Sequence, residues 1–162
     1  MTETVDETVK VLDNLYIRKY YKCVLCYLCV EAGGDDAQHT FAISFVGRGF
    51  GARFSTGFDV ALPDSACVYC GNCVAVCPTP TPSSSNGGST YAMPTTGALT
   101  TDQTVTLIVC SYCGVGCNLE LHVQNNVIVN CASPDDHSVT NWNPCIKGRF
   151  GYQYVNAPGS EQ

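Results

Sequence analysis

Cysteine spacing constrains this sequence more than any other feature. The chain of 162 residues contains 12 cysteines, and most of them stand two or three residues apart. Clusters of this kind indicate either disulfides or metal binding. The N-terminal stretch MTETVDETVKVLDNL is acidic and has no apolar segment typical of a secretory signal. Because disulfides belong mainly to secreted proteins, we expect reduced thiols, bound metal and a cytoplasmic location.

The run CVYCGNCVAVCP carries a specific iron–sulfur pattern. Its cysteines have the spacing CxxCxxCxxxC and precede Pro78. In the bacterial ferredoxin run of this form, three cysteines hold one cluster and the fourth ligates the neighbouring cluster. Zinc sites instead pair one CxxC with a distant CxxC or histidine pair. The spacing therefore favours iron–sulfur clusters over zinc.

The shorter run CVLCYLC supplies the neighbouring cluster that the fourth cysteine is expected to reach. The predicted ligands of that cluster are Cys23, Cys26, Cys29 and Cys77. The second cluster is then left with three thiolates, from Cys67, Cys70 and Cys73. Its fourth ligand would have come from the position that Gly33 occupies.

The first 79 residues resemble the two-cluster ferredoxin domain of cytoplasmic formate dehydrogenases, iron-only hydrogenases and the large iron–sulfur subunit of NADH dehydrogenases. The resemblance rests on KCVLCYLCVEA, TFAISFVGRGF and PDSACVYCGNCVAVCPT. In that family the first run ends in a further cysteine, where this chain has Gly33. Three outcomes stay open for the second site: a three-iron cluster, a four-iron cluster with a non-thiol ligand, or no cluster.

Four residues elsewhere in the sequence are candidates for the missing ligand of the second cluster. Asp35, Asp36 and His39 offer oxygen or nitrogen to iron, but GGDDAQH has the composition of an ordinary polar loop, which we favour. Cys131 is a candidate thiol. We expect it instead in a strand, as an unligated and small hydrophobic residue.

The C-terminal part of the chain has a clear β pattern. TVTLIV predicts a strand that leads into Cys110. NLELHV and VIVNCA flank Asn125-Asn126, a pair suited to a two-residue turn with positive φ. This arrangement predicts a β-hairpin.

Four cysteines in this part read CxxCxxxC followed at long range by CIKGRFG. Together with CGVGCNLELHV and SPDDH, they resemble the small iron–sulfur subdomain that begins the molybdopterin oxidoreductases, closest to formate dehydrogenase. The resemblance implies one four-iron cluster held by Cys110, Cys113, Cys117 and Cys145. It also implies that Lys147 lies between this cluster and a pterin, on the electron path. The alternative is an ordinary surface lysine.

These features predict an α+β fold. A bacterial two-cluster ferredoxin-like domain is expected over residues 1–79 and a small β-rich iron–sulfur subdomain over residues 105–162. Residues 80–104, rich in Pro, Ser, Thr and Gly, predict a linker or surface loop. The family runs CPTGAL without interruption, so residues 80–96 are an insertion, which costs little closure entropy.

A short glycine pattern and the charge content limit other functions. Gly47, Gly49 and Ala52 fit the dinucleotide pattern GxGxxA, but no βαβ unit surrounds them, so we expect a glycine-rich turn.

Charged residues make up 14% of the chain and the net charge is −6, which argues against nucleic-acid binding. No segment approaches the roughly 20 apolar residues of a membrane span, so we expect no direct membrane insertion. Sparse charge also indicates a surface partly covered by a partner.

The resemblance implies an electron-transfer role without catalysis by this chain alone. A formate dehydrogenase catalytic subunit needs several hundred more residues to bind its molybdopterin. We interpret the chain as an electron-transfer subunit with two or three iron–sulfur clusters. It would relay single electrons to or from a separate molybdopterin catalytic subunit, with further electron-transfer subunits as added partners. The alternative is a structural or adaptor subunit of a hydrogenase-like or NADH dehydrogenase-like complex. Lys147 favours the first account, and Gly33 favours the second.

Overall fold

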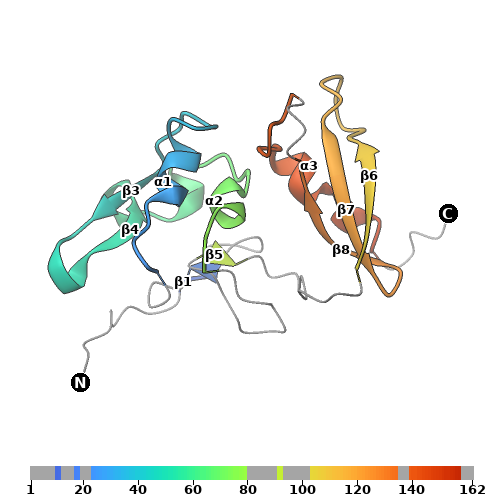
Figure 1. Cartoon of the computed structure of the whole chain (residues 1–162). Coiled ribbons are helices and arrows are strands. Elements are labelled where there is room, and N and C mark those ends of the chain that lie inside the picture. Colours follow the sequence, from blue (N-terminus) through green and yellow to red (C-terminus); the bar gives the residue numbers. More distant parts are fainter. Residues whose placement is uncertain are drawn as a thin grey trace. The chain divides into compact units, whose positions relative to one another are not determined.

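The computed structural model describes residues 10–11, 17–18, 23–79, 91–92, 103–134 and 139–157 (Figure 1). Within these ranges, short helices accompany three antiparallel sheets, in agreement with the predicted mixture of helix and strand. The chain divides into two compact units. One comprises Met1–Val68 and Asn72–Pro94, and the other comprises Tyr69–Gly71 and Thr95–Gln162.

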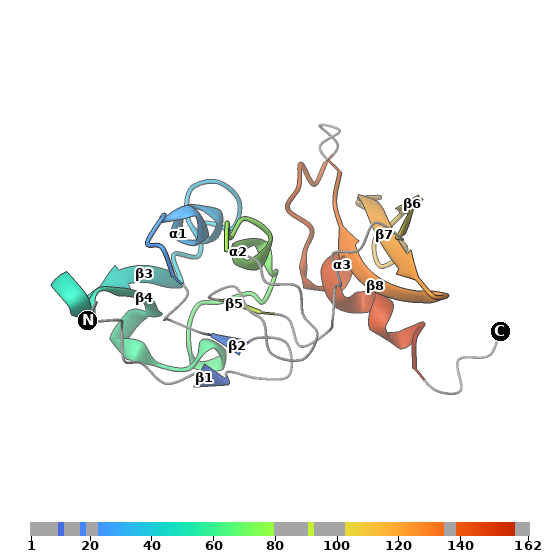
Figure 2. The same ribbon diagram turned by 60° about the horizontal axis from the view of Figure 1, so that its bottom comes forward.

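Two short helices pack against each other in the first unit (Figure 2). They are α1 (Leu28–Gly33) and α2 (Asn72–Ala75). Helix α1 also contacts β3 (Ile43–Val46), which pairs antiparallel with β4 (Arg53–Thr56). Helices of four and six residues are not stable in isolation, so their packing within the unit must hold them.

A second small sheet of the first unit joins distant parts of the sequence. Its strands are β1 (Lys10–Val11), β2 (Ile17–Arg18) and β5 (Tyr91–Ala92). They are antiparallel and lie in the order β1-β2-β5. Strand β5 falls inside the segment that the composition predicted to be a linker or loop. The rest of the 80–96 insertion lies outside the described residues.

The buried core of the first unit is small and includes a cysteine. Cys29, Ile43 and Phe54 form it, and Cys73 and Val74 of α2 are among the residues that pack against it. Other buried apolar residues of this unit are small or lie apart from this cluster: Ala32, Ala42, Ala52 and Leu62.

The glycine-rich segment forms a turn, as predicted. The 3₁₀ turn η2 (Gly49–Gly51) joins β3 to β4. Gly47 has φ of +76°, and a Cβ there would overlap the Gly51 carbonyl, so this position requires glycine. The dinucleotide pattern is therefore part of a hairpin connection.

The second unit is a three-stranded antiparallel sheet covered by a helix and a 3₁₀ turn. The strands β6 (Thr104–Val109), β7 (Asn118–Gln124) and β8 (Val127–Ala132) lie in chain order. Asn125 and Asn126 have φ of 52° and 61°, as a two-residue hairpin turn requires. The predicted strand and hairpin are confirmed.

One face of this sheet forms the second core. Helix α3 (Ile146–Phe150) and the turn η5 (Gly151–Tyr154) contact β8. The buried residues are Cys110, Leu119, Cys131 and Tyr152. Cys131 lies in β8 as expected, and its thiol donates to the Gly148 carbonyl at 3.1 Å. Among the described residues, no helix is long and apolar enough to cross a bilayer.

Candidate metal centre

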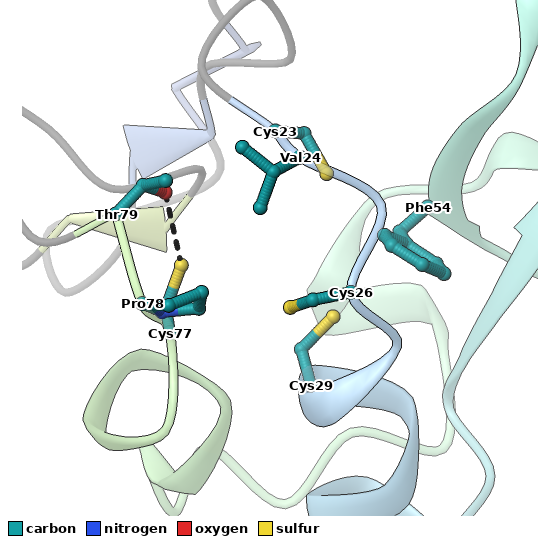
Figure 3. Close-up of a pocket in the computed structure, with 8 residues that line it drawn as sticks. All are labelled: Cys23, Val24, Cys26, Cys29, Phe54, Cys77, Pro78 and Thr79. Atoms are coloured by element: carbon teal, nitrogen blue, oxygen red, sulfur yellow. Dashed lines mark hydrogen bonds between the residues drawn. The ribbon is translucent and has the colours of Figure 1, made fainter.

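The structure gathers four cysteines around one cavity in the first unit. The cavity is lined by Cys23, Val24, Cys26, Cys29, Phe54, Cys77, Pro78 and Thr79. Figure 3 shows Cys77 on the segment that follows α2, across the cavity from the three cysteines of the early run. The geometry therefore brings Cys77 together with the early triplet rather than leaving it with its own run.

Helix packing explains this arrangement. Cys29 lies in α1, and Cys77 follows the end of α2, where its N–H donates to the Val74 carbonyl at 3.4 Å. Because α1 and α2 pack together, residues near their ends meet although they are distant in sequence. Cys23 and Cys26 lie in the loop that enters α1.

The loop around the early triplet has an uncommon backbone. Leu25 and Tyr27 have φ of 54° and 67°, values that cost energy for residues with side chains and that recur at functional sites. One consequence is visible at Cys23, whose sulfur accepts a hydrogen bond from the Leu25 N–H at 3.4 Å. Hydrogen bonds to sulfur tune the potential of an iron–sulfur cluster.

The cavity is walled by apolar side chains. Val24, Phe54 and Pro78 line it beside the cysteines. Phe54 belongs to an aromatic cluster, with ring centroids 5.0 Å from Tyr27 and 5.9 Å from Phe45. Among the four cysteines, Cys29 is buried, Cys23 and Cys77 are half-buried and Cys26 is exposed, so electrostatic interactions are strongest around Cys29.

The electrostatics of this cavity require a positively charged occupant when all four thiols ionise. Burial, followed by the charges of the three neighbouring thiolates, raises the pKa of Cys29 from 9.0 to about 12. Four thiolates therefore do not coexist in the cavity by themselves. Iron ions supply the compensating charge and suit thiolate ligands. The all-thiol donor set and its apolar walls thus fit an iron–sulfur cluster.

One further contact to a sulfur atom of this cavity involves a threonine that the sequence analysis did not single out. Thr79 Oγ1 lies 3.4 Å from Cys77 Sγ, joined by the dashed line in Figure 3. Thr79 is part of the CPT signature, but nothing in that motif alone showed a sulfur partner. All twelve cysteines lie among the described residues, and none of them is in a disulfide. Within those same residues, no group of three or more His, Cys, Asp or Glu residues forms a site for a single metal ion.

The later triplet repeats the backbone of the early one. Tyr69 has φ of 56° and Gly71 has φ of 78°. They stand at the same places relative to their cysteines as Leu25 and Tyr27 do in the early run. This later triplet consists of Cys67, Cys70 and Cys73. The two loops therefore share the same pattern of positive φ values.

Gly33 ends α1 in open surroundings. Its carbonyl accepts hydrogen bonds from the Thr40 and Phe41 N–H groups at 3.0 and 3.1 Å. A Cβ built at Gly33 meets no described atom within 4 Å. Asp35, Asp36 and His39 lie in the turn and loop that follow, with all three side chains exposed or half-buried, as a polar loop was expected to be.

The C-terminal cysteines gather at one end of the second sheet. Cys110 follows β6 and its N–H donates to the Cys117 carbonyl at 2.8 Å, while Cys145 directly precedes α3. Burial, followed by the charges of Cys110 and Cys113 and more weakly that of Cys145, raises the pKa of Cys117. The four thiols are thus close enough to interact. Lys147 is exposed in α3, two residues after Cys145.

Tyr112 lies between Cys110 and Cys113 and connects their loop to the turn η5. Its hydroxyl donates to the Gly151 carbonyl at 2.8 Å, and its ring lies 6.5 Å from that of Tyr154. Sequence reasoning did not assign this residue a role, because the contact joins segments that are 39 residues apart.

Comparison with protein families finds two iron–sulfur domains in the chain. Residues 22–81 match the 4Fe-4S dicluster domain, and residues 103–157 match the molybdopterin oxidoreductase Fe4S4 domain. The chain therefore contains both of these iron–sulfur domains. The resemblance inferred from the motifs is confirmed. Iron–sulfur clusters are the cofactors of the chain, and electron transfer is its role.

The relatives are much longer oxidoreductase polypeptides. The NADPH-Fe(3+) oxidoreductase subunit alpha of Geobacter sulfurreducens is 36% identical over 140 residues, which cover 85% of this chain and 15% of the relative. An NADH-quinone oxidoreductase subunit of Rhizobium meliloti is 28% identical over 147 residues, covering 90% of this chain and 16% of the relative. A putative formate dehydrogenase of Staphylococcus aureus is 27% identical over 168 residues, covering 84% of this chain and 17% of the relative. The chain thus spans about one sixth of the length of these relatives.

Proposed function

We propose that the chain relays single electrons to or from a separate, formate dehydrogenase-like polypeptide that binds molybdopterin. The observation that carries this proposal is the pairing of a 4Fe-4S dicluster domain with a molybdopterin oxidoreductase Fe4S4 domain. Relatives that contain a similar segment are oxidoreductase subunits about six times as long. The chemistry of the substrate would then belong to the partner.

The proposed ligand sets follow the sequence pattern, and the gathering of the thiols supports them. A first four-iron cluster would bind Cys23, Cys26, Cys29 and Cys77. A third would bind Cys110, Cys113, Cys117 and Cys145. We also propose a division of the chain into a bacterial ferredoxin-like domain over 1–79, a connecting segment over 80–104 and a β-rich subdomain over 105–162.

The second site would hold a cluster on three thiolates, from Cys67, Cys70 and Cys73. The repeated positive φ values in its loop support this, because strain of this kind persists where the surrounding function requires it. With Gly33 in place of a cysteine, one iron position would bind a non-thiol ligand or be empty, which gives a three-iron cluster.

Bound clusters supply the one-electron oxidation and reduction. The residues of the chain hold the sulfur ligands in place, and Val24, Phe54 and Pro78 line the first site beside its cysteines. The Leu25 N–H and the Thr79 hydroxyl would adjust its potential through their contacts with sulfur. Lys147, exposed beside Cys145, would lie on the electron path toward the pterin of the partner. The abundance of free thiols supports a cytoplasmic location.

Iron, sulfide and molybdenum analysis of the anaerobically purified chain tests this proposal. Three four-iron clusters give about twelve irons per chain, a three-iron cluster at the second site gives about eleven, and an empty second site gives about eight. Molybdenum or tungsten should accompany the chain on a second polypeptide. Zinc in the purified chain, or iron without sulfide, would contradict the proposal.

One observation favours an adaptor function as the second candidate. Gly33 removes a ligand from one site, which a structural subunit tolerates more easily than an electron relay does. In that case the chain would purify with hydrogenase-like or NADH dehydrogenase-like subunits and without molybdenum or tungsten. The two candidates therefore differ in a single elemental measurement.

A further inference from the structure

Strand β6 exposes an apolar surface that the described residues leave uncovered. All six residues of Thr104–Val109 are exposed. Val105, Leu107 and Val109 are 52%, 61% and 63% exposed. These three side chains alternate along the strand, so they lie on one face of the sheet. We call them the β6 stripe.

The β6 stripe lies on the face opposite the second core. Directly across from its members, β7 carries His122, Glu120 and Asn118 in register. These polar residues are typical of a strand face exposed to water. The core residues Leu119 and Cys131 occupy the other face of β7 and β8. The stripe is therefore an additional apolar surface and not an unfinished part of the core.

The edge of β6 lacks the features that protect sheet edges. It pairs with β7 alone among the strands that the structure describes. Exposed edges are usually protected by charged residues, proline or a bulge. TVTLIV contains no charged residue and no proline, and the irregularity in this sheet lies between β7 and β8. Such an edge is suited to contact with another polypeptide.

The position of the stripe favours one kind of partner. Val109 directly precedes Cys110, a proposed ligand of the third cluster. A polypeptide seated on the stripe would therefore lie next to that cluster. The relatives have about five sixths of their length beyond the segment that this chain matches, which provides a covering polypeptide of the required size. A second copy of the chain would instead cover the stripe symmetrically and bring no pterin to the cluster.

We propose that the β6 stripe and its free edge dock the molybdopterin-binding polypeptide, and so place that polypeptide beside the third cluster. This inference rests on the proposed function. It adds the surface through which the two polypeptides meet. Because the stripe members pack against no core, substitutions there should disturb the interface and leave the fold intact.

The test compares two lysine substitutions in the tagged full chain, purified anaerobically from the organism that makes it. Leu107→Lys places a charge in the centre of the stripe, opposite Glu120, where an opposite-charge pair keeps the sheet stable. Val127→Lys is the matched control, because Val127 is 46% exposed and belongs to β8 of the same sheet. Iron content and circular dichroism of both variants should equal those of the wild type.

Molybdenum and tungsten per chain, with mass spectrometry of the accompanying polypeptide, give the readout. We expect Leu107→Lys to lose at least about tenfold of the metal-bearing partner, since a buried interface position is worth more than about 1.4 kcal/mol. Val127→Lys should retain it. Full retention by Leu107→Lys would overturn the inference and leave the proposed function standing.

Two other outcomes would also contradict the docking inference. If light scattering shows a wild-type dimer that Leu107→Lys converts to a monomer, the occupant of the stripe is a second copy and the inference is wrong. If the wild-type chain brings neither molybdenum nor tungsten, the proposed function fails, and the docking surface assigned to its partner fails with it.

Discussion

Cys77 and Cys29 line the same cavity although they belong to different cysteine runs. Burial first, and then the charges of the neighbouring thiolates including that of Cys77, raises the pKa of Cys29 to about 12. Two thiols that interact in this way provide ligands to one centre more readily than to two. The relationship supports the proposal that a run of three cysteines and a run of four serve two sites.

Gly33→Cys should restore the missing ligand of the second site. The position has free space for a side chain and lies at the end of α1, so the substitution should fold normally. We expect the iron content to rise to about twelve per chain and any three-iron EPR signal to disappear.

Gly34→Cys is the control for this change. A Cβ at Gly34 would come within 2.9 Å of the Phe41 ring and 3.1 Å of the Val30 carbonyl. This variant should therefore gain no iron and lose stability. Equal iron gain in both variants would contradict the assignment of Gly33 to the second site.

Gly151→Ala should disrupt the C-terminal site through Tyr112. A Cβ at residue 151 would overlap the Tyr112 ring, whose hydroxyl donates to the Gly151 carbonyl. Because Tyr112 lies between Cys110 and Cys113, its displacement should loosen their loop. We expect a loss of about 1–3 kcal/mol in stability, seen as a lower urea midpoint, and loss of up to about four irons.

Gly114→Ala, in the same loop, meets no described atom within 4 Å of its new Cβ. It should keep the iron content and the urea midpoint of the wild type. If both alanine variants behave alike, Tyr112 does not organise this site.

Cys131 should resist alkylation while the second unit is folded. Its side chain is 1% exposed, and burial raises its pKa from 9.0 to about 11 in spite of the opposing charge of Arg149. At pH 8 about one thiol in a thousand is therefore ionised. Iodoacetamide followed by peptide mass spectrometry should label Cys131 only after unfolding. Rapid labelling of the native chain would show that this cysteine is accessible.

The same shift has a consequence for stability at alkaline pH. The folded pKa lies above the unfolded value, so the stabilisation by the neutral buried thiol is complete below about pH 9. It decreases as the pH rises toward about 11. Cys131→Ala removes this dependence, and a urea midpoint that falls equally in both proteins between pH 9 and 11 would assign the effect to other groups.

Local patterns in the sequence predicted the elements that local chemistry determines. Asn125-Asn126 predicted the hairpin because two residues with positive φ are needed there, and TVTLIV predicted β6 from its β-branched composition. The exposure of Leu107 could not be predicted, since an apolar strand is usually buried and only its neighbours in space decide otherwise. The Tyr112–Gly151 contact also depends on segments that meet only in the folded chain.

The most direct measurement of the central claim compares Cys77→Ala with Cys131→Ala by iron content and EPR under anaerobic conditions. Loss of the Cys77 thiolate should remove about one to four irons and alter the signal of the cluster bound by Cys23, Cys26 and Cys29. The signal of the later triplet and the iron content of Cys131→Ala should not change. A Cys77→Ala variant that instead alters only the cluster of Cys67, Cys70 and Cys73 would contradict the crossed arrangement.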